Sequence, residues 1–309
     1  MKKLFIIFFC LFSITIAQET LKESIVHDDL VRDYIVHIPS SYDNKVPIPL
    51  VLCFHGYGGT ASRISYTNFN NVSDTANFIV VYPQGTLLKR KSHWNVGGWT
   101  LDSKIDDVGF ISSLLDSLSE RYNINQSRIY STGMSNGGYM SFLLACQLSD
   151  RIAAIASVTG SMTPQTYNLC NPQRPIPVLQ IHGTNDQKVP YKGNRKWSLS
   201  INKVLEYWIN HNNCDITPFE MSFPDINNSD ESNVHRLSWL NGDNSVITDH
   251  IIVNGGGHDW FGVWGNMDIN STAEIWKFFS QYDILSLIHI SEPTRPERIA
   301  YSGVWVKKK

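Results

Sequence analysis

Residues 132–140 read TGMSNGGYM, a stretch that contains the pattern Gly-x-Ser-x-Gly centred on Ser135. The segment before it, RIYSTG (128–133), has the composition of a short strand, and the segment after it, 137–148, that of a helix. A serine on a sharp turn between a strand and a helix is the arrangement known as a nucleophile elbow. Gly133 and Gly137 lack side chains and let such a turn close, so the sequence predicts that Ser135 projects above the edge of a sheet.

Strand-like and helix-like segments alternate through residues 18–284. The strand-like runs are 34–38, 49–56, 78–85, 128–133, 152–160, 177–183 and 249–256, and the helix-like runs are 106–122, 137–148, 197–212 and 273–282. The polar stretch 223–239 is interpreted as a loop plus a strand. Because such alternation builds parallel sheets with helices on both faces, the sequence predicts one α/β domain over residues 18–284 with a mostly parallel central sheet.

A serine hydroxyl is a weak nucleophile at neutral pH and needs a neighbouring base. In sheets of this kind an acid and then a histidine follow the serine along the chain, each in a loop after a strand. Among the later histidines, His258 is the one that follows a strand through a glycine loop, NGGGHDW, and Asp186 lies in a turn directly after the run 177–183. We therefore predict Ser135, Asp186 and His258 as a catalytic triad.

Two backbone N–H groups are expected to stabilise the oxyanion that forms when the serine attacks a carbonyl. The N–H of Asn136 lies at the start of the predicted helix, beside Ser135. The second donor is expected from the loop HGYGG after the run 49–56, where we predict the N–H of Tyr57, with Gly58 as the alternative. His55 is expected to shape this loop and not to act as a base. Such a site requires no metal ion and no organic cofactor.

The first 17 residues have the pattern of an export signal. Lys2 and Lys3 precede an apolar run, Leu4 to Ile16, that is too short to span a membrane comfortably, and cleavage is expected after Ala17. A retained membrane anchor is the alternative. The sequence thus predicts a secreted protein, extracellular or periplasmic, with no membrane segment in its mature form.

The last 25 residues break the pattern of the domain. Within them, 285–295 (LSLIHISEPTR) resembles the in-frame translation of a sequencing adapter, so 285–309 is interpreted as a non-native tail, with a genuine linker as the alternative. A net charge of −2 offers no basic footprint for nucleic acid. Export permits disulfides, and we predict a bridge between Cys146 and Cys170 and a buried thiol at Cys53.

Several separated motifs resemble one known family. They are HGYGG, YPQG, the long run from Asp106 to Ser141, HGTNDQKVPY, and GGGHDW with the helix that follows it. Together they are similar to the secreted esterases of carbohydrate esterase family 1, a group of α/β-hydrolase fold that includes feruloyl esterases, acetylxylan esterases and polyhydroxybutyrate depolymerases. The resemblance covers residues 25–282 and implies the triad Ser135, Asp186 and His258.

The chain departs from the family at two places. It has GGGHDWFGVWG where the family often has GGGHTWPG, and Trp239, Leu240 and Asn241 stand where many members carry a cysteine that could pair with the one at Cys214. The resemblance favours a feruloyl esterase that acts on feruloylated or acetylated plant polysaccharide such as arabinoxylan. Acetylxylan esterase and polyhydroxybutyrate depolymerase are alternatives, and a serine peptidase of the prolyl-oligopeptidase type is more distant because no gating domain is visible.

Aromatic side chains in the loops are candidates for contacts with a phenolic acyl group or with sugar rings. They are Trp94, Trp99, Trp260, Phe261 and Trp264. The alternative for each is that it packs its loop onto the domain.

Overall fold

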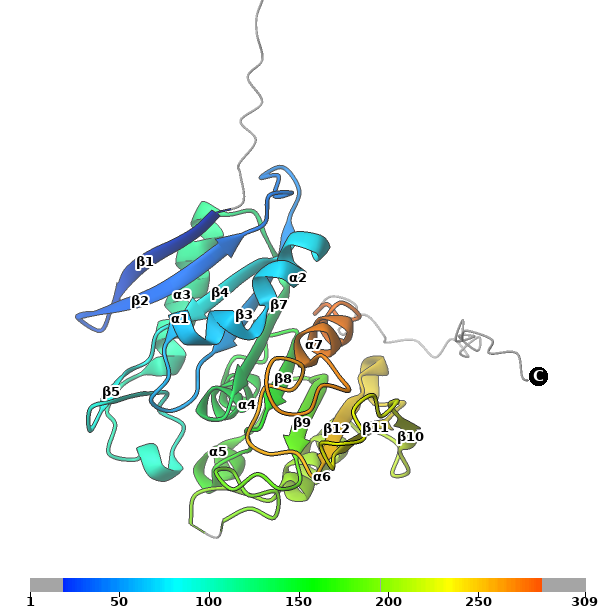
Figure 1. Cartoon of the computed structure of the whole chain (residues 1–309). Helices are drawn as coiled ribbons and strands as arrows, with labels where there is room; N and C mark the ends of the chain where they lie inside the picture. The colour runs from blue at the N-terminus through cyan, green and yellow to red at the C-terminus, as the bar shows by residue number, and fades with distance from the viewer. Residues whose placement is uncertain (1–18, 195, 285–309) are drawn as a thin grey trace, which may run out of the picture.

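The computed structural model describes residues 19–194 and 196–284. The predicted signal peptide and the predicted non-native tail lie outside the described residues. A ten-stranded sheet runs through the described part of the chain (Figure 1), in the order β1-β2-β4-β3-β7-β8-β9-β12-β11-β10. Its strands are β1 (Glu19–His27), β2 (Leu30–Ile38), β3 (Ile48–Phe54), β4 (Ile79–Pro83), β7 (Ile124–Met134), β8 (Ala154–Val158), β9 (Val178–Gly183), β10 (Phe219–Ser222), β11 (Asn233–Trp239) and β12 (Thr248–Asn254).

The centre of the sheet is parallel and its two edges are antiparallel. Strands β4, β3, β7, β8, β9 and β12 pair in parallel, whereas β1 and β2 on one side and β10 and β11 on the other pair antiparallel. The α/β fold that the sequence predicts is therefore confirmed. The carboxyl ends of the central strands lie at one edge of the sheet, where open α/β sheets place their ligand sites.

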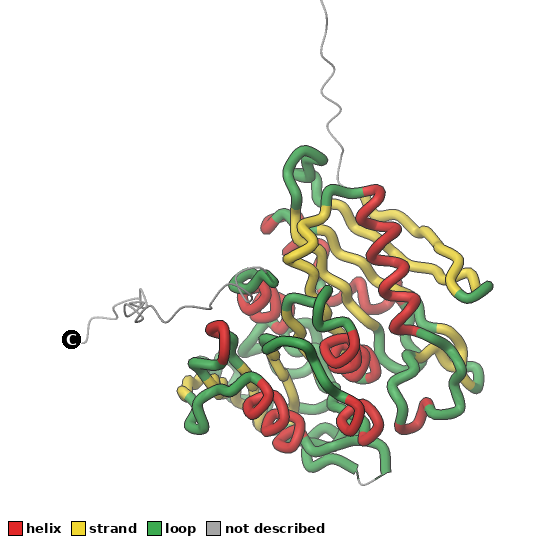
Figure 2. Tube along the Cα trace, turned by 180° about the vertical axis from the view of Figure 1, so that it is seen from behind, coloured by secondary structure: helices red, strands yellow, loops and turns green. Residues whose placement is uncertain are grey.

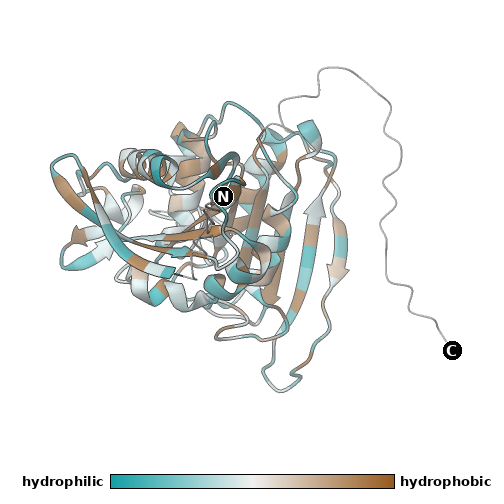
Figure 3. Cartoon of the chain, turned by 90° about the horizontal axis from the view of Figure 1, so that it is seen from above, coloured by the Kyte–Doolittle hydropathy of each residue, from teal (hydrophilic) through white to brown (hydrophobic). Residues whose placement is uncertain are grey.

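Helices cover both faces of the sheet (Figure 2). The helices are α1 (Ala61–Ile64), α2 (Phe69–Ala76), α3 (Asp107–Arg121), α4 (Asn136–Gln147), α5 (Pro164–Leu169), α6 (Ile201–His211) and α7 (Ser271–Phe279). One apolar core joins the sheet to α3, α4 and α6, and a second joins it to α1, α2 and α7. Neighbouring residues of β3 alternate between the two, with Leu52 in the first core and Cys53 in the second. Figure 3 shows the apolar strands between the two helix layers.

The structure differs from the sequence prediction mainly at the margins. The helix expected over 197–212 begins at Ile201, because the Ser200 side chain accepts a hydrogen bond from the N–H of Lys203 and caps the helix there. The hydrophobic pattern does not predict the edge strands β1 and β10. It also does not predict the hairpin formed by β5 (Thr86–Leu88) and β6 (Lys91–His93). Exposed edge strands bury little apolar surface, so their pattern is weak.

The predicted disulfide is confirmed. Cys146 at the end of α4 is bonded to Cys170 just after α5, with their Cα atoms 4.7 Å apart. Cys53 is a buried free thiol, as expected, and burial raises its pKa. Cys214 is also free and lies beside the carbonyl of Val246 and the hydroxyl of Thr248. No helix in the described ranges has the length and apolar character needed to cross a membrane.

Candidate active site

Ser135 lies between β7 and α4 in a backbone conformation that is unusual for a residue with a side chain. Its φ is 55° and its ψ is −120°, and its N–H donates to the carbonyl of Val158 (2.9 Å). The turn closes because two positions have no Cβ. A Cβ at Gly137 would lie 2.2 Å from the carbonyl oxygen of Phe54, and one at Gly133 would lie 2.6 Å from the backbone of Gly137. The structure therefore has the elbow that the sequence predicts.

Asp186 and His258 are hydrogen-bonded across two neighbouring strand ends. Asp186 follows β9, His258 follows β12, and Nδ1 of His258 lies 2.7 Å from Oδ2 of Asp186. The other carboxylate oxygen accepts the N–H groups of Lys188 and Val189, each at 2.8 Å. Because a carboxylate accepts, Nδ1 carries the proton, which leaves Nε2 of His258 free to accept one.

The buried Asp186 carboxylate is held in its ionised form. Burial alone would raise the pKa of Asp186, but hydrogen bonds from His182, His258 and the Val189 N–H together lower it below its usual range. His182 has Nε2 at 3.4 Å from Asp186 and 2.9 Å from the carbonyl of Val189. The Gln180 amide donates to Nδ1 of His182 (3.0 Å), which places the proton of His182 on Nε2, toward the acid. His182 is not part of the predicted triad, and its contacts make it a support for Asp186.

The loop after β3 is fixed by His55. Nδ1 of His55 donates to the carbonyl of Gly56 (2.8 Å), and Nε2 accepts the N–H of Gly85 (3.0 Å). Burial lowers the pKa of His55 to about 4, so the ring is neutral at pH 7. These contacts agree with the expectation that His55 shapes the loop after β3 and does not act as a base.

The predicted oxyanion donors are the backbone N–H groups of Tyr57 and Asn136, with Gly58 as the alternative to Tyr57. The N–H of Gly58 donates to the carbonyl of Ser92 (2.7 Å), so the alternative donor of the prediction is already engaged. The N–H of Tyr57 is not among the described backbone groups that have a backbone partner. Asn136 occupies the first position of α4, where a helix leaves its N–H groups unpaired, and its amide side chain bonds both the N–H and the carbonyl of Trp94.

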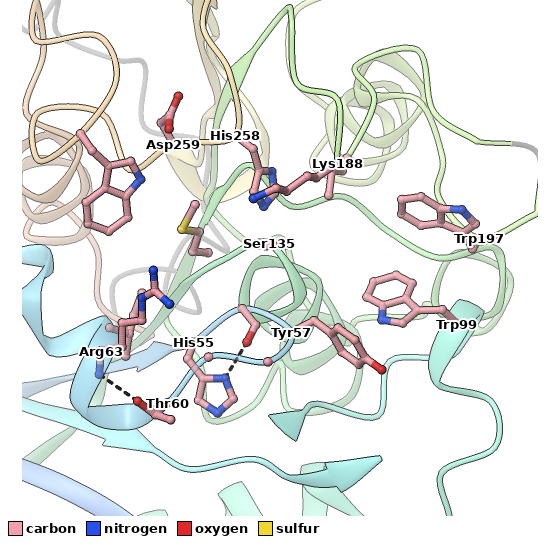
Figure 4. A pocket seen from close by; sticks show the side chains of 17 residues that line it. His55, Tyr57, Thr60, Arg63, Trp99, Ser135, Lys188, Trp197, His258 and Asp259 are labelled. Carbon is pink, nitrogen blue, oxygen red and sulfur yellow. Dashed lines mark hydrogen bonds between the residues drawn. The ribbon is translucent and has the colours of Figure 1, made fainter. Parts of the chain in front are cut away.

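Ser135 and His258 open into one cavity of about 590 Å³. Its two sides differ in chemistry (Figure 4): Tyr57, Trp99 and Trp197 lie on one side of Ser135, and Arg63 lies on the other. Trp99 and Trp197 meet edge to face, with ring centres 5.2 Å apart. Trp264, Lys188 and Asp259 complete the polar and aromatic part of the lining.

The five aromatic residues predicted to bind substrate separate into two groups. Trp99 and Trp264 line the cavity. The prediction is corrected for Trp94, Trp260 and Phe261, which are fully buried and contribute nothing to the cavity wall. They pack the loops onto the domain, which was the alternative reading of each.

Among the cavity-wall residues that sequence reasoning missed are Trp197, Arg63 and Lys188. Trp197 was placed on a helix, but the cap at Ser200 leaves it in the preceding loop, and a serine three residues before Lys203 was the available signal. Arg63 and Lys188 gave no signal, because exposed cations occur all along the sequence. Their position beside Ser135 follows from the folding of two loops onto one edge of the sheet.

One group of metal-ligand side chains occurs among the described residues. His27, Asp28 and Asp106 lie together between the β1–β2 turn and the start of α3, and none of them lines the cavity. The Asp106 carboxylate already accepts the N–H of Gly109 as the cap of α3.

Comparison with known proteins places this geometry in a family. The model of the family described as Phospholipase/Carboxylesterase matches residues 41–230, which include Ser135 and Asp186 but not His258. A bifunctional acetylxylan esterase/xylanase of Neocallimastix patriciarum is 28% identical over 256 residues, 82% of this chain and 34% of that protein. Feruloyl esterase B of Piromyces equi is 34% identical over 167 residues, 52% of this chain and 30% of that protein.

The chain spans about a third of the length of these two curated relatives. Among solved structures, an acetyl xylan esterase from Aspergillus awamori superposes with a TM-score of 0.64 at 15% identity, over 85% of this chain and 99% of the other. This likeness concerns the fold. The resemblance to feruloyl and acetylxylan esterases that the motifs indicate is confirmed by these relatives.

Proposed function

The chain belongs to the phospholipase/carboxylesterase family, and we propose that it is a secreted serine esterase that releases ferulic acid from feruloylated plant polysaccharide. The observation that carries the proposal is the Asp186–His258 hydrogen bond of 2.7 Å beside a serine on a strained elbow, in a cavity with an aromatic wall. Relatives named feruloyl esterase and acetylxylan esterase support the substrate class.

In the proposed mechanism, Nε2 of His258 takes the proton of Ser135 while Oγ attacks the ester carbonyl. The negative charge on the carbonyl oxygen is stabilised by the N–H groups of Tyr57 and Asn136, each of which contributes about 3 kcal/mol in sites of this kind. The tetrahedral intermediate expels the sugar alkoxide, which receives the proton from His258, and the acyl group stays on Ser135. Water then attacks the acyl-enzyme with His258 again as base, which frees ferulate and restores Ser135.

Asp186 orients the imidazole and stabilises its charged form. Its lowered pKa keeps Asp186 ionised at neutral pH, so its carboxylate accepts the hydrogen bond from Nδ1 of His258. No step of this mechanism calls for a metal or an organic cofactor.

The aromatic half of the cavity supports a phenolic acyl group over acetate. A feruloyl ring is planar and can stack on or meet edge-on the indoles of Trp99 and Trp197, whereas an acetyl group would leave that wall without a partner. Acetylxylan esterase is the second candidate, because the relative with that activity in its name aligns over 82% of this chain. The polyester depolymerase and peptidase alternatives have no comparable support in the cavity.

Secretion is part of the proposal. The signal-like residues 1–17 and the Cys146–Cys170 bridge both fit an oxidising compartment outside the cytosol. Recovery of the protein from the culture medium, with an N-terminus at residue 18, would test it.

Ester turnover by the purified protein tests the proposal directly. Ferulate release from methyl ferulate and from a feruloylated arabinoxylan oligosaccharide is measured beside acetate release from acetylated xylan, with Ser135→Ala as the blank. We expect rapid ferulate release that the substitution abolishes. Acetate release without ferulate release would move the substrate to the second candidate, and a folded protein silent on every ester would refute the esterase assignment.

A further inference from the structure

The cavity contains a guanidinium that has no partner among the residues the structure describes. The side chain of Arg63, on α1, has no ion pair or hydrogen bond within residues 19–194 and 196–284, although it lines the cavity beside Ser135. Its backbone is fixed, since its N–H donates to the side chain of Thr60 (3.1 Å). Figure 4 shows the guanidinium directed into the half of the cavity opposite Trp99 and Trp197.

The other charged groups of the cavity do not neutralise Arg63. Lys188 is a second cation without a partner among the described residues, and Figure 4 shows it extending toward His258. Asp259 is the one acidic residue of the lining, and Figure 4 shows its carboxylate turned away from Ser135. The acid of the triad, Asp186, lies behind His258 and is saturated by its own hydrogen bonds. The region between Arg63 and Ser135 therefore has a net positive character.

A guanidinium presents two parallel N–H donors that match the two oxygens of a carboxylate. If the feruloyl group occupies the aromatic half, the sugar portion of the ester extends into the Arg63 half, because the scissile carbonyl lies at Ser135 between them. A carboxylate close to the ester bond would then meet Arg63. Trp264 also lines the cavity and offers a flat apolar surface to a sugar ring.

We propose that Arg63 is a specificity residue that binds a carboxylate on the sugar portion of the substrate, so that the enzyme prefers esters on uronic-acid-substituted xylan over esters on neutral xylan. This proposal rests on the proposed esterase function for the direction of the substrate, but the binding it describes is measurable without turnover.

Binding is measured by calorimetry on the Ser135→Ala protein, which cannot turn over an ester. The probes are two xylo-oligosaccharides of equal length, one neutral and one bearing a single 4-O-methylglucuronic acid. We expect the acidic oligosaccharide to bind about tenfold more tightly at low ionic strength, as a charged bidentate hydrogen bond implies, and the difference to shrink as salt is added. Equal affinity for the two probes would overturn the proposal.

Substitution of Arg63 assigns the effect to this residue. In the Ser135→Ala background, Arg63→Gln should abolish the preference, and Arg63→Lys should keep only part of it, because an ammonium lacks the forked geometry. Lys45→Gln removes an exposed cation that does not line the cavity and should leave the preference unchanged. A preference that survives in Arg63→Gln would contradict the proposal.

Turnover of methyl ferulate separates this proposal from the proposed function. Methyl ferulate has no sugar, so the acidic and neutral oligosaccharides can be compared as inhibitors of its hydrolysis with Ser135 intact. The acidic oligosaccharide should inhibit more strongly, and Arg63→Gln should abolish that difference. If the unmodified enzyme fails to hydrolyse methyl ferulate but still binds the acidic probe through Arg63, the esterase proposal fails and the carboxylate site stands.

Discussion

Two loops at the carboxyl edge of the sheet, 94–100 and 258–264, each contain one buried tryptophan and one tryptophan that lines the cavity. In each loop the first tryptophan is fully buried and donates its indole N–H, Trp94 to the carbonyl of His55 and Trp260 to the hydroxyl of Thr272, both at 2.9 Å. In each loop a later tryptophan, Trp99 or Trp264, is half-buried and lines the cavity. An indole with a satisfied N–H in the core supports the loop, and one on the wall is free to meet a ligand.

The two loops differ in their histidines. The first loop rests on His55, which is buried and neutral, and Trp94 lies against its ring with centres 5.0 Å apart. The second loop begins with His258, which faces the cavity and is held by Asp186. The first loop therefore shapes the site, while the second supplies a reacting group to it.

The largest expected effect is the loss of kcat when the hydrogen bond from His258 of the second loop to Asp186 is altered. Asp186→Asn would present an amide N–H to Nδ1 of His258 and force the proton onto Nε2, where it can no longer accept from Ser135. We expect kcat to fall about 10⁴-fold, as for the same change in other triads. Methyl ferulate turnover measures it.

The backbone contacts of residue 186 survive this change, because the side-chain oxygen of asparagine can still accept from Lys188 and Val189. The fold should therefore be retained, as judged by circular dichroism. A fall of less than tenfold would show that His258 does not depend on Asp186 for its tautomer.

The next effect compares the two tryptophans of the second loop. Trp260→Ala removes a buried indole that meets Phe69 edge to face, with ring centres 6.0 Å apart, and leaves a cavity in the core. We expect the free energy of unfolding to fall by about 3–5 kcal/mol. Trp264→Ala should lower it by less than about 1.5 kcal/mol, because that side chain is only partly buried. Urea denaturation of both variants measures the difference. Equal losses of unfolding free energy would contradict the assignment of Trp260 to the core and Trp264 to the cavity wall.

The free energy of unfolding should fall in acid because His55, which supports the first loop, is buried in its neutral form. Burial lowers the pKa of His55 to about 4, below the ordinary value of 6.5, so the unfolded chain binds a proton between these values and the folded chain does not. Stability therefore falls as the pH is lowered from 6.5 toward 4, by about 3 kcal/mol for this residue at the lower end. The buried His250, whose pKa is lowered to about 3, acts in the same direction.

His55→Gln isolates this contribution, since glutamine does not titrate. The variant should be less stable at pH 7 because the loop loses its hydrogen bonds, but its stability should decline less steeply with acid. Urea midpoints at pH 7, 5.5 and 4.5 give both slopes. Parallel slopes would mean that the pKa of His55 is not lowered in the folded protein.

The contrast between the loops also explains what the sequence could predict. The order of serine, acid and histidine, each after a strand, predicts Ser135, Asp186 and His258, and the structure brings all three to one edge of the sheet. The central strands were predictable because they are buried on both faces and read as apolar runs. The Cys146–Cys170 bridge was predicted as the preferred pair in an exported chain, although pairing itself cannot be derived from a sequence.

The aromatic side chains were beyond this reasoning. All five occur in loops, where neither periodicity nor turn chemistry tells the inward side chain from the outward one. Trp94 and Phe261 are buried by contacts with segments distant in sequence, such as Phe54 for Trp94. Arg63 and Trp197 reach the cavity only because the sheet brings the loops after β3 and β9 together. Tertiary packing, and not local sequence, decides which loop residues form a wall.

The smallest expected effect is the most specific test of the first loop. Trp99→Ala removes one wall of the aromatic half and its edge-to-face contacts with Tyr139 and Trp197, whose ring centres lie 5.0 and 5.2 Å away. An aromatic contact of this kind contributes about 1 kcal/mol beyond burial, so we expect kcat/KM for methyl ferulate to fall by about fivefold. Acetate release from an acetylated xylo-oligosaccharide should change less than about twofold, because acetyl does not reach that wall. Trp94→Phe is the matched variant, because it removes the indole N–H bond to the carbonyl of His55 beneath the site and should slow both substrates alike. A fall of equal size for both esters in Trp99→Ala would mean that Trp99, like Trp94, supports the loop and does not contact the acyl group.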